Sequence, residues 1–198
     1  MTDFILASGS AGRRMILENA GLSFSAHPAD VDEEAIRQAF LSNHPADFSP
    51  LALELACAKA RAVSSAEGLP VLGGDQILVC DGELFSKPAD MEGARRTLKR
   101  LRGRKHRLIS ALAVARGAEV VWRHVSHADL VMRPFTDAFL DDYLERVGER
   151  ALSSVGCYQV EGPGIQLFER IEGDWFTIIG LPLLPFLEWL RGEGIVPA

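Results

Sequence analysis

The stretch Leu6-Ala7-Ser8-Gly9-Ser10-Ala11-Gly12-Arg13-Arg14 joins the first apolar run of the chain to its first helical pattern. The apolar run, Phe4-Ile5-Leu6, is long enough for a buried strand. A helical pattern begins at Met15 and ends at Gly21. The stretch therefore predicts a strand, a loop of small residues and a helix.

The loop and the helix start have the features of an anion site. Ser10 is a typical N-cap residue, which would place Arg13 near the third helical position. Backbone N–H groups at a helix N-terminus attract anions, and small residues let an anion approach the backbone closely. Arg13 and Arg14 add forked donors that match phosphate oxygens. The spacing leaves open the alternative of an ordinary strand–turn–helix with solvated arginines.

The composition is typical of a globular protein with one large domain or two closely joined lobes. Of its 198 residues, 47% are hydrophobic and 24% are charged, and no apolar run approaches the ~20 residues needed to span a bilayer. The N-terminus lacks the basic region of a signal peptide, and three scattered cysteines favour free thiols in a reducing compartment. We therefore expect a cytoplasmic protein with no membrane partner.

The formal net charge of −6 disfavours general binding to nucleic acid or to anionic membranes. The segment from Arg95 to Arg107 is nonetheless basic, with eight lysines or arginines. The usual explanation of such a run is a solvated helix face that continues into a loop, and the alternatives are anion binding or a subunit contact. We expect no nucleic-acid partner.

Two other charged features have competing interpretations. The acidic loop Val31-Asp32-Glu33-Glu34 precedes a helix, where acidic side chains are electrostatically ordinary; the alternative is a ligand of a hard divalent cation. Lys59 lies in a helix expected from Ser49 to about Ser65, where a lysine is more often a surface residue than a phosphate ligand. Ser49 is expected to cap this helix, because Pro50 suits its first position.

An expected buried strand over residues 69–80 contains Gly73-Gly74-Asp75-Gln76 between two apolar runs. Two glycines and a carboxylate inside a buried strand are locally costly. Strand glycines often mark a bulge or the close approach of a ligand, and an acidic residue among apolar neighbours is a candidate base or metal ligand. A functional role for Asp75 is preferred, because a purely structural one must explain a charge in a buried strand.

The remaining pattern mixes strands and helices. Asp81-Gly82 is a hairpin turn signal, and a second hairpin is expected where residues 108–115 and 120–132 are joined by a short loop. We expect helices over residues 91–101, 137–147 and 183–191, and strands over residues 22–27, 165–171 and 175–179. Because strands and helices alternate early and a hairpin follows, the sequence predicts an α/β fold with a mixed rather than purely parallel sheet.

Motifs along nearly the whole chain resemble, in the same order, those of the Maf proteins. This family comprises cytosolic nucleoside triphosphate pyrophosphatases that are also linked to septum formation. The matching segments are Leu6–Arg14, Val31–Glu33, Lys59-Ala60, Gly74–Gln76, Ser86–Asp90, Gly103–His106 and Ile179–Leu183.

The resemblance implies a single Maf-like domain over residues 1–198, with a twisted mixed sheet, flanking helices and two lobes around a nucleotide cleft. It implies a divalent cation, Mg²⁺ or Mn²⁺, as cofactor and a homodimer as the assembly. The implied reaction is hydrolysis of a nucleoside triphosphate between its α and β phosphates, which releases a monophosphate and pyrophosphate. Such an enzyme would remove non-standard nucleotides from the cell.

Carried over by position, the resemblance implies that Asp75 is the proton acceptor that activates water. Glu33 would be a metal ligand together with Asp75. The phosphates would be held by Ser8, Arg13, Arg14, Lys59 and Lys87. Hydrolysis of a highly charged triphosphate depends mainly on positioning and on cationic stabilisation of the transferring group, which such residues can supply.

Three further positions bear on which base is selected. Gln76 and Glu161, like the segment from Gly162 to Glu169, resemble the Maf branch that hydrolyses 7-methyl-GTP. The hypothesis is that the Glu161 carboxylate accepts hydrogen bonds from guanine N1–H and N2–H₂ and favours a cationic methylated base. Gly12 stands where that branch has Trp, which removes a possible stacking platform.

Two alternatives belong to other classes of protein. One is a nucleotide-binding regulator of cell division without meaningful catalysis, and the other is a phosphatase that removes single phosphates. A regulator would not require Asp75, Glu33 and several cationic side chains together, so their joint presence favours the pyrophosphatase. The identity of the product, pyrophosphate or orthophosphate, separates the two enzymes.

Overall fold

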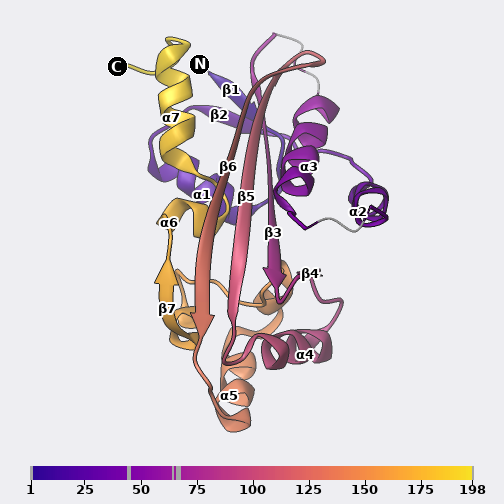
Figure 1. The fold of residues 1–198 in the computed structure, drawn as a ribbon. Helices are drawn as coiled ribbons and strands as arrows, with labels where there is room; N and C mark the ends of the chain where they lie inside the picture. The colour runs from indigo at the N-terminus through magenta and orange to yellow at the C-terminus, as the bar shows by residue number, and fades with distance from the viewer. Residues whose placement is uncertain (1, 44–45, 64, 66–67, 198) are drawn as a thin grey trace. The chain divides into compact units, whose positions relative to one another are not determined.

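The computed structural model describes residues 2–43, 46–63, 65 and 68–197 (Figure 1). Its strands are β1 (Phe4–Leu6), β2 (Phe24–Ala26), β3 (Val71–Cys80), β4 (Glu83–Phe85), β5 (Lys105–Arg116), β6 (Glu119–Met132) and β7 (Phe168–Glu172). Its α-helices are α1 (Ala11–Asn19), α2 (Glu33–Leu41), α3 (Ser49–Ala62), α4 (Met91–Leu101), α5 (Asp137–Val147), α6 (Trp175–Ile179) and α7 (Leu183–Gly192). Two 3₁₀ helices, η1 (Gly148–Ser153) and η2 (Pro163–Leu167), complete the described elements.

The strands form one seven-stranded mixed sheet in the order β2-β1-β3-β5-β6-β7, with β4 paired to β3. β1 is parallel to β2 and to β3. β4 is antiparallel to β3, and β7 is antiparallel to β6. The turn between β3 and β4 is the expected hairpin, because Asp81 and Gly82 have φ of 51° and 79° as a two-residue turn of this kind requires. The predicted α/β fold with a mixed sheet is thereby confirmed.

The chain divides into two compact units. The first contains residues 1–76, 109–126 and 175–198, and the second contains residues 77–108 and 127–174. The expectation of a single domain over residues 1–198 stays a prediction.

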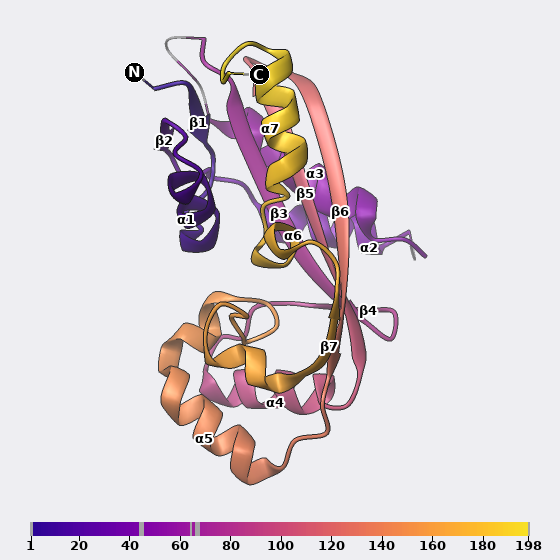
Figure 2. The same ribbon diagram turned by 90° about the vertical axis from the view of Figure 1, so that its left-hand side faces the viewer.

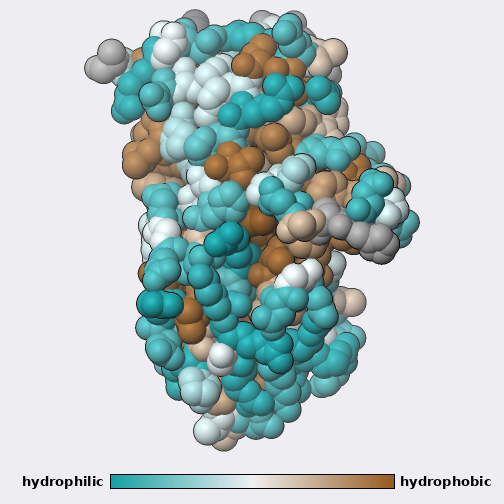
Figure 3. Space-filling model, viewed as in Figure 1, coloured by the Kyte–Doolittle hydropathy of each residue, from teal (hydrophilic) through white to brown (hydrophobic). Residues whose placement is uncertain are grey.

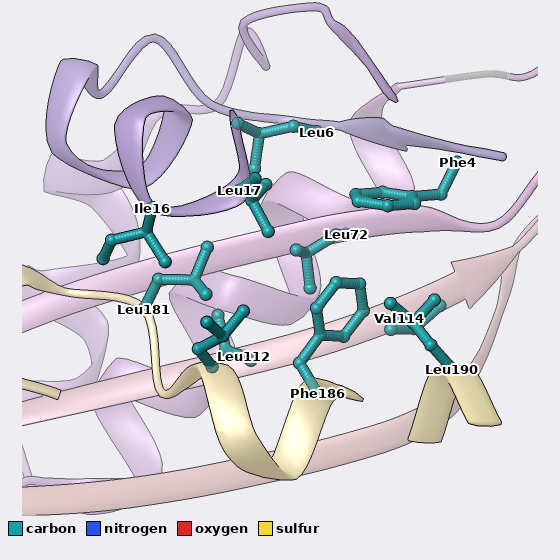
Figure 4. Close-up of a cluster of buried hydrophobic side chains, with 11 residues drawn as sticks. Phe4, Leu6, Ile16, Leu17, Leu72, Leu112, Val114, Leu181, Phe186 and Leu190 are labelled. Carbon is teal, nitrogen blue, oxygen red and sulfur yellow. The ribbon is translucent and has the colours of Figure 1, made fainter. Parts of the chain in front are cut away.

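The first unit has helices on both sides of its strands, α1 and α7 on one side and α3 on the other (Figures 1 and 2). Side chains from β1, β3, β5, α1 and α7 share one buried cluster (Figure 4). Within it the rings of Phe4 and Phe186 meet edge to face, with centroids 5.2 Å apart. Burial of apolar surface of this kind is the main stabilising contribution to the unit.

Buried polar groups mark the core of the second unit. His106 is 2% exposed, and its Nε2 lies 2.7 Å from the hydroxyl of Tyr158. The ring of Phe168 packs against both residues. Burial lowers the pKa of His106 to about 4, so the imidazole is neutral at pH 7.

Three local predictions were wrong. Residues 175–179 form helix α6 instead of a strand. None of the strands that the structure describes pairs with them, and two of their backbone carbonyls accept side-chain hydrogen bonds. The strand expected from residue 165 begins at Phe168, because the preceding five residues form η2. Ser49 lies inside α3 and does not cap it, since the carboxylate of Asp47 accepts hydrogen bonds from the Ser49 backbone N–H and hydroxyl.

No helix among residues 2–43, 46–63, 65 and 68–197 is long and apolar enough to cross a membrane.

Candidate active site

The N-terminus of α1 has the predicted geometry. Ser10 is the N-cap, and its Oγ accepts a hydrogen bond from the backbone N–H of Arg13 at 3.4 Å. Arg13 is thereby the third residue of the helix, as the sequence predicts. The backbone N–H of Ser10 donates in turn to Ser8 Oγ at 3.2 Å, which holds the loop between β1 and α1 in a tight turn.

Arg13 is a buried cation, 7% exposed, and not a solvated arginine. Its Nε donates to the carbonyl oxygen of Gly180 at 2.8 Å, and its Nη1 donates to Ser8 Oγ at 3.1 Å. Burial lowers the pKa of Arg13, and the negative charges of Asp75 and Glu33 oppose that shift. The guanidinium therefore stays charged and is fixed in one orientation by two neutral acceptors.

Gly74 on β3 is explained by this arginine. A Cβ at Gly74 would lie 3.2 Å from Arg13 Nε and 3.1 Å from a methyl group of Leu112. The missing side chain gives the guanidinium room to lie against the strand. Gly74 thus serves the packing of a charged group of the same chain.

Gly73 allows a different close approach. A Cβ there would lie 2.2 Å from the carbonyl oxygen of Ala56 and 2.5 Å from the backbone nitrogen of Ala60, both on α3. The sequence predicted a bulge or a ligand at these glycines. The structure instead packs the backbone of α3 directly onto β3, which brings Lys59 beside Asp75.

Lys59 joins two carboxylates that are far apart in the sequence. Its Nζ lies 2.6 Å from Asp75 Oδ1 and 2.8 Å from Glu33 Oε1. The Lys59 side chain is 12% exposed and that of Asp75 is 6% exposed, whereas that of Glu33 is 40% exposed. Lys59 is therefore a largely buried, ion-paired residue, and the interpretation of a surface lysine is wrong.

Asp75 has one carboxylate oxygen without a partner. Oδ1 accepts from Lys59, but Oδ2 is buried and makes no hydrogen bond to any residue that the structure describes. Leaving a buried charged acceptor unsatisfied is costly, which indicates a group that binds there during function. A divalent cation or a water molecule would satisfy this oxygen.

The donor set fits a hard cation that keeps much of its own water. Among the residues that the structure describes, no group of three or more His, Cys, Asp or Glu side chains is placed to hold a metal. Asp75 and Glu33 nonetheless converge on the same ammonium group. Two carboxylates, completed by water and phosphate oxygens, are a usual protein contribution to a Mg²⁺ site.

Gln76 follows Asp75 on β3 and is anchored to the end of α6. Its Nε2 donates to Ser110 Oγ (2.9 Å), Thr177 O (3.0 Å) and Ile178 O (3.0 Å). Ser110 Oγ also donates to Thr177 O at 2.8 Å. The residue predicted to select the base thus also connects β3 to α6.

The structure distributes the other predicted site residues as follows. Arg14 is exposed on α1, and Gly12 is half-buried, with Ile179 Cγ2 3.1 Å from the place of a Cβ. Lys87 and Glu161 are exposed and belong to the second unit, and the site described above lies within the first.

Sequence reasoning missed three contributors to the site. They are Ser110 on β5, the carbonyl oxygens of Thr177, Ile178 and Gly180, and Arg37 on α2, whose Nη2 lies 3.7 Å from Glu33 Oε2. The segment around Gly180 did match a family motif, but a motif does not say that its backbone is the part that acts. Ser110 had no signal, because a lone serine in an apolar strand resembles many buried serines.

The basic segment from Arg95 to Arg107 is neutralised in the second unit. Each of its eight cations lies within 4.0 Å of a carboxylate; the carboxylates belong to Asp81, Glu83, Glu92, Asp129, Asp137 and Asp141. In Figure 3 the surface over α4 is largely hydrophilic. Paired charges of this kind are what the interpretation of a solvated charged face expects, and the alternatives of anion binding and a subunit contact stay predictions.

Comparison with known proteins gives close relatives over nearly the full length. The chain is 52% identical over 194 residues to a 7-methyl-GTP pyrophosphatase of Rhizobium etli, which covers 97% of this chain and 96% of the relative. It is 49% identical over 199 residues to a nucleoside triphosphate pyrophosphatase of Gluconobacter oxydans, covering 100% and 98%. Among solved structures, a dITP/XTP pyrophosphatase of Mycobacterium abscessus has a TM-score of 0.42 and 16% identity, covering 98% and 97%.

A protein-family model described as "Maf-like protein" matches residues 3–193. The match includes β1, the α1 N-terminus, Lys59 and the Gly-Gly-Asp-Gln segment of β3, which together build the site. The chain belongs to the Maf family.

Proposed function

We propose that this protein is a nucleoside triphosphate pyrophosphatase that releases a nucleoside monophosphate and pyrophosphate. One observation carries the proposal: Asp75 is a buried carboxylate with one oxygen on Lys59 and the other without a partner, and the buried Arg13 lies against the preceding residue, Gly74. A base and fixed cations at one place are what hydrolysis of a polyphosphate needs. The names of the relatives at about half identity support the same reaction.

In the proposed reaction Asp75 accepts the proton of the attacking water. The water oxygen bonds to the α-phosphorus, the bond to the bridging oxygen breaks, and pyrophosphate leaves. Asp75 suits this role because its Oδ2 is buried yet unsatisfied, so a water bound there is oriented before it reacts. Oδ1 is held by Lys59, which fixes the plane of the carboxylate.

Arg13 and Ser8 are proposed to hold phosphate oxygens. The guanidinium is already immobilised by Gly180 and Ser8, so little conformational entropy is lost when an anion binds. Such a preorganised cation stabilises charge that develops in the transition state. Lys59, Arg14 and Lys87 are proposed to add positive charge for the rest of the triphosphate.

Metal dependence is part of the proposal. Asp75 and Glu33 would hold Mg²⁺ or Mn²⁺, which would neutralise phosphate charge and lower the pKa of a bound water. The convergence of the Asp75 and Glu33 carboxylates on one ammonium group supports this assignment.

For the substrate we propose a guanine nucleotide methylated at N7. Relatives named 7-methyl-GTP pyrophosphatase, which are about half identical to this chain, support this choice. A carboxylate at position 161 suits a methylated guanine, which carries positive charge. Removal of such modified nucleotides would be a house-cleaning role in nucleotide metabolism.

The test is product analysis with a panel of triphosphates: 7-methyl-GTP, GTP, dTTP and UTP, each with Mg²⁺, Mn²⁺ or a chelator. We expect pyrophosphate as the product, no turnover with the chelator and the highest kcat/KM on 7-methyl-GTP. Orthophosphate as the first product would indicate a phosphatase. Tight binding without turnover of any substrate would favour the regulator of cell division.

A further inference from the structure

The side-chain amide of Gln76 can adopt only one orientation. Its nitrogen is within 3.0 Å of two backbone carbonyl oxygens, Thr177 O and Ile178 O. Rotation of the amide by 180° would place Oε1 against these oxygens, which accept hydrogen bonds and cannot donate them. The contacts of Nε2 therefore also determine the position of Oε1.

Ser110 is the side chain that completes this arrangement. It is 0% exposed on β5, and its hydroxyl accepts from Gln76 Nε2 while donating to Thr177 O. The amide nitrogen of Gln76 has two hydrogens. The Ser110 hydroxyl accepts one of them, which leaves the other for the carbonyl oxygens of Thr177 and Ile178. The same hydroxyl ties the Thr177 carbonyl to β5, so Gln76 and α6 are positioned by one atom.

The fixed Oε1 lies beside Gly180. A Cβ at Gly180 would be 3.5 Å from Gln76 Oε1, and the carbonyl oxygen of Gly180 accepts the hydrogen bond of Arg13 Nε. Gly180 thus lies between the Arg13 guanidinium and the fixed Oε1 of Gln76. Gln76 as a whole is only partly buried.

We propose that Ser110 is a positioning residue for substrate selection. It holds Gln76 so that Oε1 is a fixed acceptor for an N–H donor of the nucleobase. This inference rests on the proposed function, because it assumes a nucleoside triphosphate as the substrate. A base that lacks the matching N–H leaves a polar oxygen unsatisfied and is turned over less well.

The test measures the selectivity between GTP and two analogues, ITP and O6-methyl-GTP. ITP lacks the 2-amino group, and O6-methyl-GTP lacks N1–H. We expect the wild-type protein to discriminate against at least one analogue by about three- to tenfold in kcat/KM, the range of one hydrogen bond. In Ser110→Ala, where only the backbone carbonyls still hold the amide, this discrimination is expected to decrease, whereas Ser110→Thr, which keeps the hydroxyl, retains it.

A double-mutant cycle separates positioning from simple destabilisation. If Ser110 acts through Gln76, Ser110→Ala changes the selectivity ratio in the wild-type background but not in a Gln76→Ala background. Val114→Ala is the matched control, because Val114 is equally buried on β5 and belongs to the apolar cluster. It is expected to lower stability and leave the selectivity ratio unchanged.

The orientation of Gln76 is also measured without substrate. The exchange of the two side-chain amide protons of Gln76 with solvent is followed by NMR. It is expected to be slow in the wild-type protein and at least tenfold faster in Ser110→Ala. If Ser110→Ala turns over the triphosphates with the same selectivity as the wild-type protein, this inference is overturned and the proposed function is not. No wild-type turnover of any triphosphate overturns the proposed function, and with it the role of Ser110.

Discussion

Lys59 and Asp75, sixteen positions apart, form an ion pair of 2.6 Å between Nζ and Oδ1 in the interior of the first unit. The pair exists because Gly73 allows α3 to lie directly against β3. An ammonium group thus compensates a buried carboxylate that has a second, unsatisfied oxygen.

Removing the cation leaves the buried carboxylate uncompensated. Lys59→Met is expected to reduce the free energy of unfolding by about 3 kcal/mol, as for other broken buried ion pairs, when measured by urea denaturation with a chelator present. When Mn²⁺ is added in place of the chelator, Lys59→Met is expected to regain part of the lost free energy of unfolding, because a bound cation replaces the ammonium group. Lys99→Met, which removes an exposed pair with Asp137, serves as the control and is expected to cost less than 1 kcal/mol. Equal losses in the two variants would contradict the role of Lys59.

The orientation of Arg13 requires its forked guanidinium. Arg13→Lys keeps the charge but cannot donate simultaneously to Gly180 O and Ser8 Oγ in the same geometry. We expect kcat/KM for a triphosphate to fall by about 10²-fold or more, the usual cost of losing a preorganised donor. For the control Arg14→Lys, on the exposed side of α1, kcat/KM is expected to fall much less. A smaller effect at position 13 than at position 14 would refute the assignment.

Gly73 has no room for a methyl group. Gly73→Ala would place a Cβ 2.2 Å from the Ala56 carbonyl oxygen, so that α3 must shift and Lys59 with it. We expect a loss of about 3 kcal/mol in the free energy of unfolding, typical of overpacking, together with lower activity. Gly192→Ala is the matched control, since no atom lies within 4 Å of its Cβ position. Similar melting temperatures for the two variants would show that the contact is not tight.

His106 makes the stability of the protein depend on pH. Its pKa is about 4 in the folded protein because of burial and about 6.5 in the unfolded chain, so the unfolded chain binds the proton first. The neutral imidazole contributes about 3 kcal/mol to the free energy of unfolding. This contribution is complete above pH 6.5 and is lost as the pH falls towards 4. In His106→Gln, urea denaturation at a series of pH values is expected to show a flatter dependence between pH 6.5 and 4. The exposed His27→Gln should behave as the wild type, and an unchanged slope in His106→Gln would exclude His106 as the cause.

The sequence predicted the parts of the site that depend on neighbouring residues. Ser10 caps α1 and places Arg13 third because capping is a local contact, and Asp75 lies on a buried strand because its apolar neighbours extend on both sides. The matching motifs also contain Glu33 and Lys59, although the sequence does not show that their side chains meet.

The parts that the sequence did not reveal depend on contacts between distant residues. Residues 175–179 have the composition of a strand but form a helix, since their carbonyls are bound by Gln76 and Ser110, which lie 101 and 67 positions before Thr177. Gly73 and Gly74 were expected to mark a bulge or a ligand, whereas α3 and Arg13 occupy the space beside them. Spacing along the chain carries no information on such partners.

The most direct test of the proposed reaction is pyrophosphate release by Asp75→Asn. Asn has the same shape but cannot accept the proton of water, so we predict a loss of turnover by at least 10²-fold with 7-methyl-GTP and Mg²⁺. Asp81→Asn, in the exposed turn after β3, is the control and should retain wild-type turnover. If Asp75→Asn is folded and releases pyrophosphate at the wild-type rate, Asp75 is not the base and the proposed mechanism is wrong.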